Sequence, residues 1–523
     1  GLTGPATELS LAVLLNDEDP DGDVLEVRQV TQPLHGQVTI EPDGTLSYLP
    51  KKGYTGSDQF RYWVTDGSVD VPALVELEVA PESAADPLLF PATIDDGTAP
   101  FDHVYVGLAL LNAQDRFEQL QIRAFGGDGR EVAAATHVGS LPPKGQEAFL
   151  TSELRDPKGQ AQYIAATNFT QDLQGMLVVG DYNSRRMDGI GARPAAGRQL
   201  YIPEVLMAAD AQTFLQLINR EARAGSIDLE LYDGKSRRPA RWSGTIQPSG
   251  SLRGLVSDFF GYTDGFQGFV KVVSDVDLSG IAVSAGSEWI STAPTMVPRS
   301  SRTWTAPHIF ADRNGGDTFI RILNTSLLDA SGDLTIFNDA GQVVSSRRLF
   351  IPAQKLTVMA ASQLFGGLLD IKGIISGSMV LTLDGNVPPP QVALVTYVTP
   401  KARTTVPLLR EGETNATFPQ VAHSKDEGIF TGLAIFNPSS ATAHVTLEVY
   451  DAGGRQTARL ELSLPPKARE AGLLGEPELF GPDFEQIRGH IRIRSDRPVF
   501  SYITFGDQDG ETLSALEPQP NHQ

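Results

Sequence analysis

The 523-residue chain has no cysteine, which excludes disulfide frameworks, thiolate zinc sites and cysteine nucleophiles. It also has no apolar run long enough to span a bilayer, so we expect no membrane insertion of this chain. Basic residues are scarce: 42 Lys and Arg stand against 64 Asp and Glu, which gives a net charge of −22. Because such a surface repels polyanions, we expect no nucleic-acid partner.

The motifs of the common catalytic sites are missing as well. The eight histidines are scattered, and none forms an HExxH motif or a pair at metal-ligand spacing. The segment "GSLRG" (250–254) places its serine one position too early for a nucleophile elbow. Carboxylates are so numerous that a pair of them does not indicate a glycosidase. The sequence therefore predicts a protein that is not an enzyme.

Glycine and proline are plentiful, at 51 and 35 residues, as is typical of many short strands and turns. Up to about Ala80, alternating stretches such as "GQVTIEPDGTLSYLP" (36–50) and "DQFRYWVTDG" (58–67) are separated by turns, without helical periodicity. We expect one β-domain over 1–80. The polar segment "APESAADP" (80–87) is expected to be a linker.

The remainder contains a fourfold repeat, in which alternating apolar residues lead through an aromatic residue into an Asp, Asn or Gly turn. The copies of this pattern begin 107, 105 and 113 positions apart. They are "IRAFGGDGR" (122–130), "LELYDGKSR" (229–237), "LTIFNDAGQ" (334–342) and "LEVYDAGGR" (447–455), with the aromatic residues Phe125, Tyr232, Phe337 and Tyr450.

When the four copies are aligned on this pattern, further positions are shared. Each copy has a proline near its start and an apolar strand that ends in asparagine: Pro91, Pro203, Pro307 and Pro419, then Asn112, Asn219, Asn324 and Asn437. Three copies carry an aromatic–Gly turn, "SDFFG", "SQLFG" or "PELFG", which ends at Gly261, Gly366 or Gly481. The first copy lacks this turn and is the most divergent.

The strand prediction is clearest in "HVTLEVYD" (444–451), where Val445, Leu447 and Val449 face one way and the residues between them the other. Period two with one apolar face indicates a sheet covered on one side, hence a sandwich. We predict an all-β fold, an elongated tandem array of Ig-like β-sandwich domains. After the domain over 1–80, repeats 1 to 4 are expected to span 88–199, 200–302, 303–408 and 409–523.

A stretch from "LLNDEDPDGDVLEV" (14–27) to "VTDG" (64–67) carries a family pattern that covers most of residues 8–79. By this pattern the first unit resembles the bacterial Ig-like, cadherin-like repeats of large surface adhesins. The resemblance implies an exported structural spacer, often stabilised by calcium. Such repeats usually begin with an extra strand for which this chain has few residues, so the first strand is expected to be missing. The unpaired edge could then accept a strand from another chain. Repeats 1 to 4 resemble, more loosely, repeats of secreted bacterial proteins without an established function.

The acidic stretch "NDEDPDGD" (16–23) is the candidate metal site. It matches the first half of an EF-hand loop, but Arg28 occupies the place of the bidentate glutamate and a strand follows directly, so an EF-hand is rejected. A structural Ca²⁺ site of another kind remains, which Asp66 or Asp70 would complete; the alternative is an Asp-rich turn that caps backbone amides. The proposed ligands are Asp17, Asp19, Asp21 and Asp23.

We expect a non-enzymatic, extracellular or cell-surface protein, namely a multi-domain spacer or a subunit of a bacterial surface assembly or fibre. Its expected partners are copies of itself or other surface proteins. The alternative is a carbohydrate-binding adhesin, or an accessory region of a larger secreted enzyme. Trp242, Trp289 and Trp304 could form a sugar platform, although core or inter-domain packing explains them more simply. His35 is expected to be a turn residue.

Overall fold

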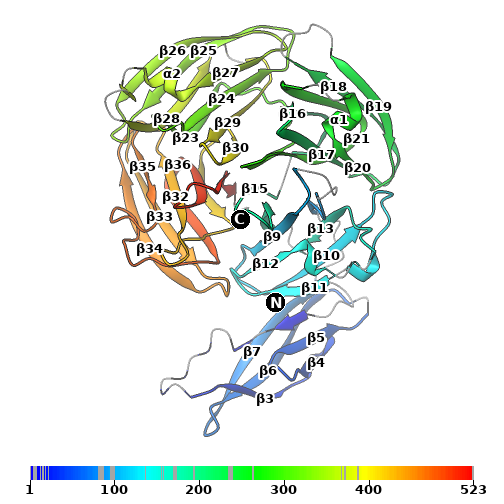
Figure 1. The fold of residues 1–523 in the computed structure, drawn as a ribbon. Helices are drawn as coiled ribbons and strands as arrows, with labels where there is room; N and C mark the ends of the chain where they lie inside the picture. The colour runs from blue at the N-terminus through cyan, green and yellow to red at the C-terminus, as the bar shows by residue number, and fades with distance from the viewer. Residues whose placement is uncertain are drawn as a thin grey trace.

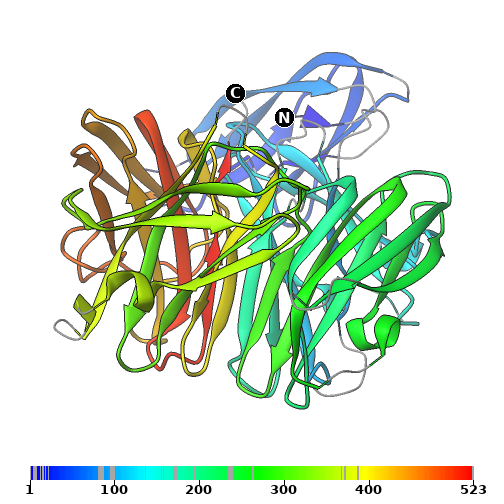
Figure 2. The ribbon, with the colours of Figure 1, turned by 90° about the horizontal axis from the view of Figure 1, so that it is seen from above.

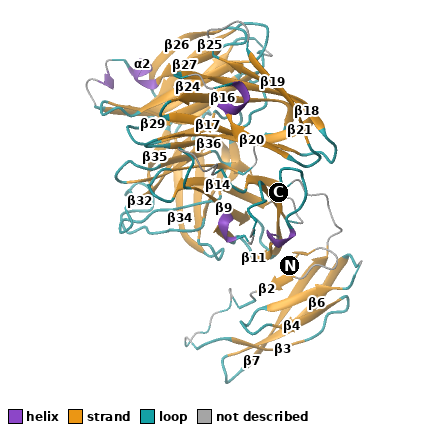
Figure 3. Ribbon diagram, turned by 45° about the vertical axis from the view of Figure 1, so that its right-hand side comes forward, coloured by secondary structure: helices purple, strands orange, loops and turns teal. Residues whose placement is uncertain are grey.

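The computed structural model describes the chain except for residues 1, 4–8, 12, 15–16, 18, 20, 22, 53, 80–86, 95–99, 136, 155, 157, 169–172, 193–194, 234–238, 262–263, 367, 370–372, 386–387 and 521–523. The prediction of an all-β chain of tandem sandwiches is confirmed, since nearly all of its regular elements are strands (Figure 3). The helices α1 (Val256–Phe260) and α2 (Ala361–Phe365) have 5 residues each.

The first domain is a small sandwich around its own core. Leu9, Leu11, Tyr48, Phe60 and Leu77 are almost fully buried between its two sheets. One sheet has the order β2-β5-β4, and the other contains β3-β6-β7. The strands are β2 (Leu9–Leu11), β3 (Glu26–Val30), β4 (Gly36–Ile40), β5 (Leu46–Pro50), β6 (Gly56–Thr65) and β7 (Asp70–Val79).

A short strand joins this domain to repeat 1. The strand β1 (Leu2–Thr3) pairs in parallel with Glu78 and Val79 of β7 and, on its other side, with the first residue of β10 (Glu118–Phe125). One end of the β7 edge is therefore covered by the same chain. The predicted linker over 80–87 lies outside the described residues except for Pro87.

Each repeat has a peripheral sheet and a central sheet. The peripheral sheets have the orders β8-β13-β10-β11, β16-β21-β18-β19, β23-β28-β25-β26 and β31-β36-β33-β34. The central sheets have the orders β12-β9-β14-β15, β20-β17-β21-β22, β27-β24-β29-β30 and β35-β32-β36-β37. In repeats 2 and 4 one long strand, β21 or β36, serves both sheets.

The remaining bounds follow the chain. Repeat 1 contains β8 (Leu88–Pro91), β9 (Val104–Asn112), β11 (His137–Leu141), β12 (Gln146–Leu150), β13 (Tyr163–Thr167), β14 (Leu173–Asp181) and β15 (Met187–Gly191). Repeat 2 contains β16 (Gly197–Ala208), β17 (Ala211–Asn219), β18 (Gly225–Tyr232), β19 (Ala240–Ile246), β20 (Ser251–Leu255), β21 (Phe266–Gly286) and β22 (Ile290–Pro294). Repeat 3 contains β23 (Thr303–Asp312), β24 (Asp317–Asn324), β25 (Ala330–Phe337), β26 (Val343–Ile351), β27 (Leu356–Ala360), β28 (Ile374–Leu383), β29 (Gln391–Val398) and β30 (Arg403–Pro407). Repeat 4 contains β31 (Glu413–Phe418), β32 (Ile429–Phe436), β33 (Ala443–Tyr450), β34 (Gln456–Leu464), β35 (Arg469–Leu473), β36 (His490–Asp507), β37 (Leu513–Leu516) and β38 (Gln519–Pro520).

Period-two alternation produces these strands as expected. In β33, Val445, Leu447 and Val449 are buried in one apolar cluster. In the neighbouring β34, Leu460 and Leu462 pack against the same cluster while Glu461 between them is exposed. Each strand therefore has one face in the core of its sandwich.

The four repeats close into a ring, and this corrects the elongated array expected for them (Figures 1 and 2). The last strand of each central sheet lies at the ring centre, where β15, β22, β30 and β37 contact one another in cyclic order. Repeat 4 consequently packs against repeat 3 and also against repeat 1. The first domain projects from the ring beside repeat 1 (Figure 1).

At three of the four junctions a backbone contact of one kind joins a repeat to the next. The turn that follows the aromatic residue accepts a hydrogen bond from the hairpin of the following repeat. The pairs are Ser251 N–H to Gly127 O (3.1 Å), Arg469 N–H to Asp339 O (2.9 Å) and Gln146 N–H to Ala452 O (2.9 Å). The third pair links repeat 4 to repeat 1 and closes the ring. The corresponding turn of repeat 2 falls on residues 234–238, outside the described part of the chain.

Glycine is required where these backbones meet. In repeat 1 the hairpin turn is closed by Gly145 N–H donating to Pro142 O at 2.9 Å, and its third residue, Lys144, has a φ of 54°. A turn of this kind directs the carbonyl of Pro143 outward, toward Gly454 of repeat 4. A Cβ on Gly454 would overlap that oxygen, and its φ of 85° also favours glycine. The residues equivalent to Lys144, which also have positive φ, are Ser249, Gln354 and Lys467.

The asparagine column has a structural role beside the same hairpins. The buried Asn437 side chain donates through Nδ2 to the carbonyls of Ala441 (2.8 Å), Leu464 (2.9 Å) and Pro465 (3.0 Å). Its Oδ1 accepts from the N–H of Ser439 at 2.9 Å. Equivalent bonds are made by Asn112, Asn219 and Asn324. The column therefore ties the end of one strand to the hairpin that contacts the neighbouring repeat.

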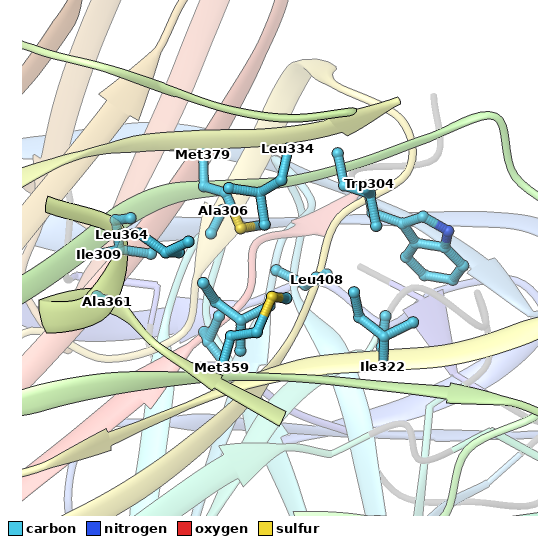
Figure 4. Close-up of a cluster of buried hydrophobic side chains, with 14 of the residues drawn as sticks. Trp304, Ala306, Ile309, Ile322, Leu334, Met359, Ala361, Leu364, Met379 and Leu408 are labelled. Atoms are coloured by element: carbon cyan, nitrogen blue, oxygen red, sulfur yellow. The ribbon is translucent and has the colours of Figure 1, made fainter. Parts of the chain in front are cut away.

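The aromatic–Gly turns close one end of three sandwiches. In repeat 3, Leu364 and Phe365 of α2 are buried before Gly366, which ends the helix with a φ of 56°. Figure 4 shows Ala361 and Leu364 beside Ile309 in this core. The counterparts that pack on their own cores are Phe259 and Phe260 in repeat 2, and Leu479 and Phe480 in repeat 4. Repeat 1 has a short 3-10 turn over Thr151–Glu153 at this place instead.

A buried carboxyl group lies at the ring centre. Asp188 of β15 accepts hydrogen bonds from Thr292 N–H (2.6 Å) and Thr292 Oγ1–H (3.0 Å), from Thr404 Oγ1–H (2.7 Å) and from Gly189 N–H (2.8 Å). Ser514 in turn accepts from Gly189 N–H at 2.9 Å, so one network joins all four repeats. Burial outweighs these bonds and raises the pKa of Asp188 to about 7.

The substitution Gly454→Ala tests the closing contact. We expect it to lower the free energy of unfolding by about 2–3 kcal/mol, because it combines backbone strain with a clash against Pro143. The matched control is Gly481→Ala in the same repeat, where φ is 87° and no heavy atom lies within 4 Å of an added Cβ. The control is expected to cost about 1 kcal/mol, from strain alone. Equal losses in calorimetric or denaturant unfolding would contradict the closing contact.

Asp188 gives the ring a predictable pH dependence. Its folded-state pKa of about 7 lies above the ordinary value of 3.8, so the folded protein retains a proton that the unfolded chain releases. Stability is therefore expected to fall as pH rises from about 4 to about 7, by on the order of 4 kcal/mol from this group. In Asp188→Asn that component of the slope should vanish. The measurement is the free energy of unfolding of both proteins across this pH range. If it depends on pH in the same way in both, Asp188 does not titrate there.

Candidate functional site

In the acidic loop of the first domain, the carboxylate of Asp19 accepts hydrogen bonds from the backbone of the loop itself. Asp19 Oδ1 accepts from the N–H groups of Asp21 (2.9 Å) and Asp23 (3.1 Å). Asp17 Oδ2 accepts from the Tyr62 hydroxyl at 3.3 Å. Burial, together with the charge of Asp17, raises the pKa of Tyr62 to about 12. This is the arrangement of an Asp-rich turn; Pro20 and Gly22 within it lie outside the described residues.

The two carboxylates that would complete a calcium site are engaged elsewhere. Asp66 Oδ1 accepts from the N–H groups of Ser68 (2.6 Å) and Val69 (2.7 Å). Asp70 forms an ion pair with Arg28 at 2.6 Å, and this hydrogen bond lowers the pKa of Asp70. Within the described residues, no group of three or more acidic or histidine side chains is arranged to hold a metal. Calcium at Asp17, Asp19, Asp21 and Asp23 therefore stays a prediction.

The three tryptophans do not share a surface. Trp304 is 3% exposed and lies in the core of repeat 3 (Figure 4). The Arg403 guanidinium lies over the ring of Trp289, 5.4 Å from its centroid, at the boundary of repeats 2 and 3. Trp242 packs edge-on against Phe259 within repeat 2. Packing thus explains these residues, and the sugar platform that they could have formed is not assembled.

His35 and His308 have structural surroundings. His35 stacks on Tyr54 with ring centroids 4.0 Å apart, as a turn residue of the first domain. His308 lies beside Arg469 of repeat 4, and burial together with that charge lowers the pKa of His308 to about 3. A histidine with this pKa is neutral at physiological pH and cannot exchange protons there.

A buried ion cluster between repeats 2 and 3 was not predicted. Glu204 pairs with Arg321 at 2.7 Å and with Arg403, both from repeat 3. Burial alone would raise the pKa of Glu204, but the two arginines outweigh it and lower the pKa. The sequence marks these contacts at the position directly after the shared proline of each repeat. The residues at this position are Ala92, Glu204, His308 and Gln420. In repeats 2 to 4 this residue meets a side chain of the next repeat.

No helix in the described part of the chain is long and apolar enough to cross a membrane. No curated protein sequence matches the chain. Solved structures that match the chain include the following two. The native conformation of E. coli alpha-2-macroglobulin has 11% identity and a TM-score of 0.12, over 99% of this chain and 46% of that one. The N-terminal four Ig domains of Dscam1 isoform 6.9 have 9% identity and a TM-score of 0.09, over 76% of this chain and 90% of that one.

The family comparison concerns the first domain. Residues 2–76 match the family model described as bacterial Ig domain. The match covers the strands from β1 through most of β7. The first domain of this chain is therefore a bacterial Ig-like repeat segment.

Proposed function

We propose that the chain is a non-enzymatic, extracellular protein of a bacterial surface, in which the Ig-like domain is a spacer and the ring is a rigid adhesive head. The observation that carries the proposal is ring closure by the Gln146–Ala452 backbone bond. A closed ring holds the loops of its repeats at fixed distances, and binding to a preorganised surface costs little ordering entropy.

Two further features support a surface role. Bacterial Ig-like domains occur typically in surface and exported proteins, and this one projects from the ring where a spacer would (Figure 1). The repeats share a scaffold but differ in their loops, which is typical of domains that present binding surfaces. The net charge of −22 keeps such a head soluble.

Attachment by the intact chain tests this proposal. We expect a non-adherent bacterium that displays the full chain on its surface to attach to cells or to coated surfaces. The Gly454→Ala variant, displayed at the same density, should attach less because its ring is weakened, whereas Gly481→Ala should behave more like the wild type. An adhesive role would be refuted if bacteria that display the chain attach no more strongly than the same strain without it, and if the purified chain turns over a polysaccharide or peptide substrate.

A second candidate role is growth of a fibre by strand addition, which the edge of β7 favours. Over Asp70–Leu77 this strand pairs with β6 on one side, and no other described strand covers its second edge. The edge carries Val71 and Leu74, which are 58% and 46% exposed. An uncovered edge with apolar side chains is a template for a strand of another chain.

Sedimentation at rising concentration tests strand addition. We expect oligomers that grow with concentration and that are lost in the double variant Val71→Lys, Leu74→Lys, since edge lysines oppose strand pairing. The control Val343→Lys replaces a valine of similar exposure, 59%, in repeat 3 and should leave the oligomers unchanged. A monomer at every concentration would exclude this route to a fibre.

A further inference from the structure

Repeat 1 departs from the other repeats at the end of its sandwich. Where repeats 2 to 4 place an aromatic–Gly turn, it has Thr151–Glu153 followed by Leu154, and a cleft of about 540 Å³ opens there. The floor is made of small and branched apolar side chains from both sheets: Val104, Val106, Ala124, Ala135 and Ile164. All five are buried, and Phe101 of repeat 1 is fully buried in the same core, so the cleft lies against a core that is already filled.

A second departure falls on the mouth of the same cleft. Tyr105 of β9 and Tyr182, just after β14, lie with ring centroids 5.0 Å apart at 53°. Strand pairing places their counterparts at Gln212 and Ser287 in repeat 2, Asp317 and Pro400 in repeat 3, and Phe430 and Gln508 in repeat 4. None of these pairs is doubly aromatic. Repeat 1 thus has a tyrosine pair where the other three repeats have none.

Polar groups surround the two tyrosines. The Ser152 hydroxyl lies 3.5 Å from the Tyr182 hydroxyl, and Tyr182 is 58% exposed. Asp156 lines the cleft with a carboxylate that is oriented by the N–H groups of Lys158 and Ala161. Arg253 reaches in from repeat 2 and donates to the Thr93 carbonyl at 3.3 Å. Hydroxyl, carboxylate and guanidinium groups thus converge around an aromatic face.

We propose that this cleft binds a sugar residue of a surface glycan. Its volume falls in the range of about 300–1,000 Å³ that is usual for ligand sites. A pyranose has an apolar face of C–H groups that would stack on Tyr182 and a rim of hydroxyls that both donate and accept. Asp156 accepts, Arg253 donates, and Ser152 and Tyr105 do either, which is the mixture that a polyol needs.

The inference deepens the adhesive role proposed above and rests on it, but it has its own test. Saturation-transfer NMR with the full chain would use the methyl glycosides of glucose, galactose, mannose, N-acetylglucosamine and N-acetylneuraminic acid. We expect at least one to bind. Tyr182→Ala should weaken its affinity about tenfold, and Ser152→Trp, which fills the mouth, should abolish binding.

Matched controls separate the cleft from general damage to the ring. Phe350→Ala removes an aromatic side chain of similar exposure, 60%, in repeat 3. Ser257→Trp makes the Ser152 change at the equivalent position of α1 in repeat 2. Both should leave glycoside affinity unchanged. Binding that persists in Tyr182→Ala and Ser152→Trp, or binding of indole and phenol but of none of the glycosides, would overturn the proposal. Displayed chains that still attach would then show that only the cleft, and not the adhesive role, had been wrong.

Discussion

The ring depends on a place where two backbones meet without a side chain between them. At three junctions a glycine of one repeat faces a carbonyl of the next: Gly129 and Pro248, Gly341 and Pro466, Gly454 and Pro143. A single backbone hydrogen bond contributes only about 1 kcal/mol. In a closed ring, however, every junction is held in place by the others, so the last one forms at a high effective concentration. Closure thus fixes the repeats relative to one another, whereas a linear array with the same contacts would let them move.

Around this common contact the side chains differ, so that each repeat fits one neighbour. The first residue after the hairpin is Gln146, Ser251, Leu356 or Arg469 in repeats 1 to 4. Gln146 bonds to Gln420 of repeat 4, and Ser251 Oγ donates to Gln162 of repeat 1 at 2.6 Å. Leu356 joins an apolar cluster with residues of repeat 2, whereas Arg469 pairs with Asp339 of repeat 3. An arginine that met the apolar cluster would be buried without a partner, which disfavours a wrong order of repeats.

Local features of this fold could be read from the sequence, whereas the relations between repeats could not. Alternation placed Val445, Leu447 and Val449 in a core, and the asparagine column marked a recurring structural position. The ring was not foreseen because the hairpin residues with positive φ are Lys144, Ser249, Gln354 and Lys467, which do not stand out as glycines would. The contact that closes the ring joins Gln146 to Ala452, far apart in the chain. The partners of side chains could not be predicted for the same reason. No local pattern showed that Asp70 would pair with Arg28 instead of joining the acidic loop.

Ring closure also completes the core of repeat 1. This repeat lacks the aromatic–Gly turn, and its own Ile94 and Phe101 are fully buried in its core. It shares that core with a neighbour, as repeats 3 and 4 do: Phe214, Val283 and Ile290 of repeat 2 belong to the same buried cluster as Leu108 and Ile164. Phe214 lies with its ring centroid 6.0 Å from that of Phe101. Isolated from repeat 2, the sandwich of repeat 1 would expose this apolar surface to water. The ring therefore stabilises the repeat that carries the cleft, because the neighbour covers part of its core.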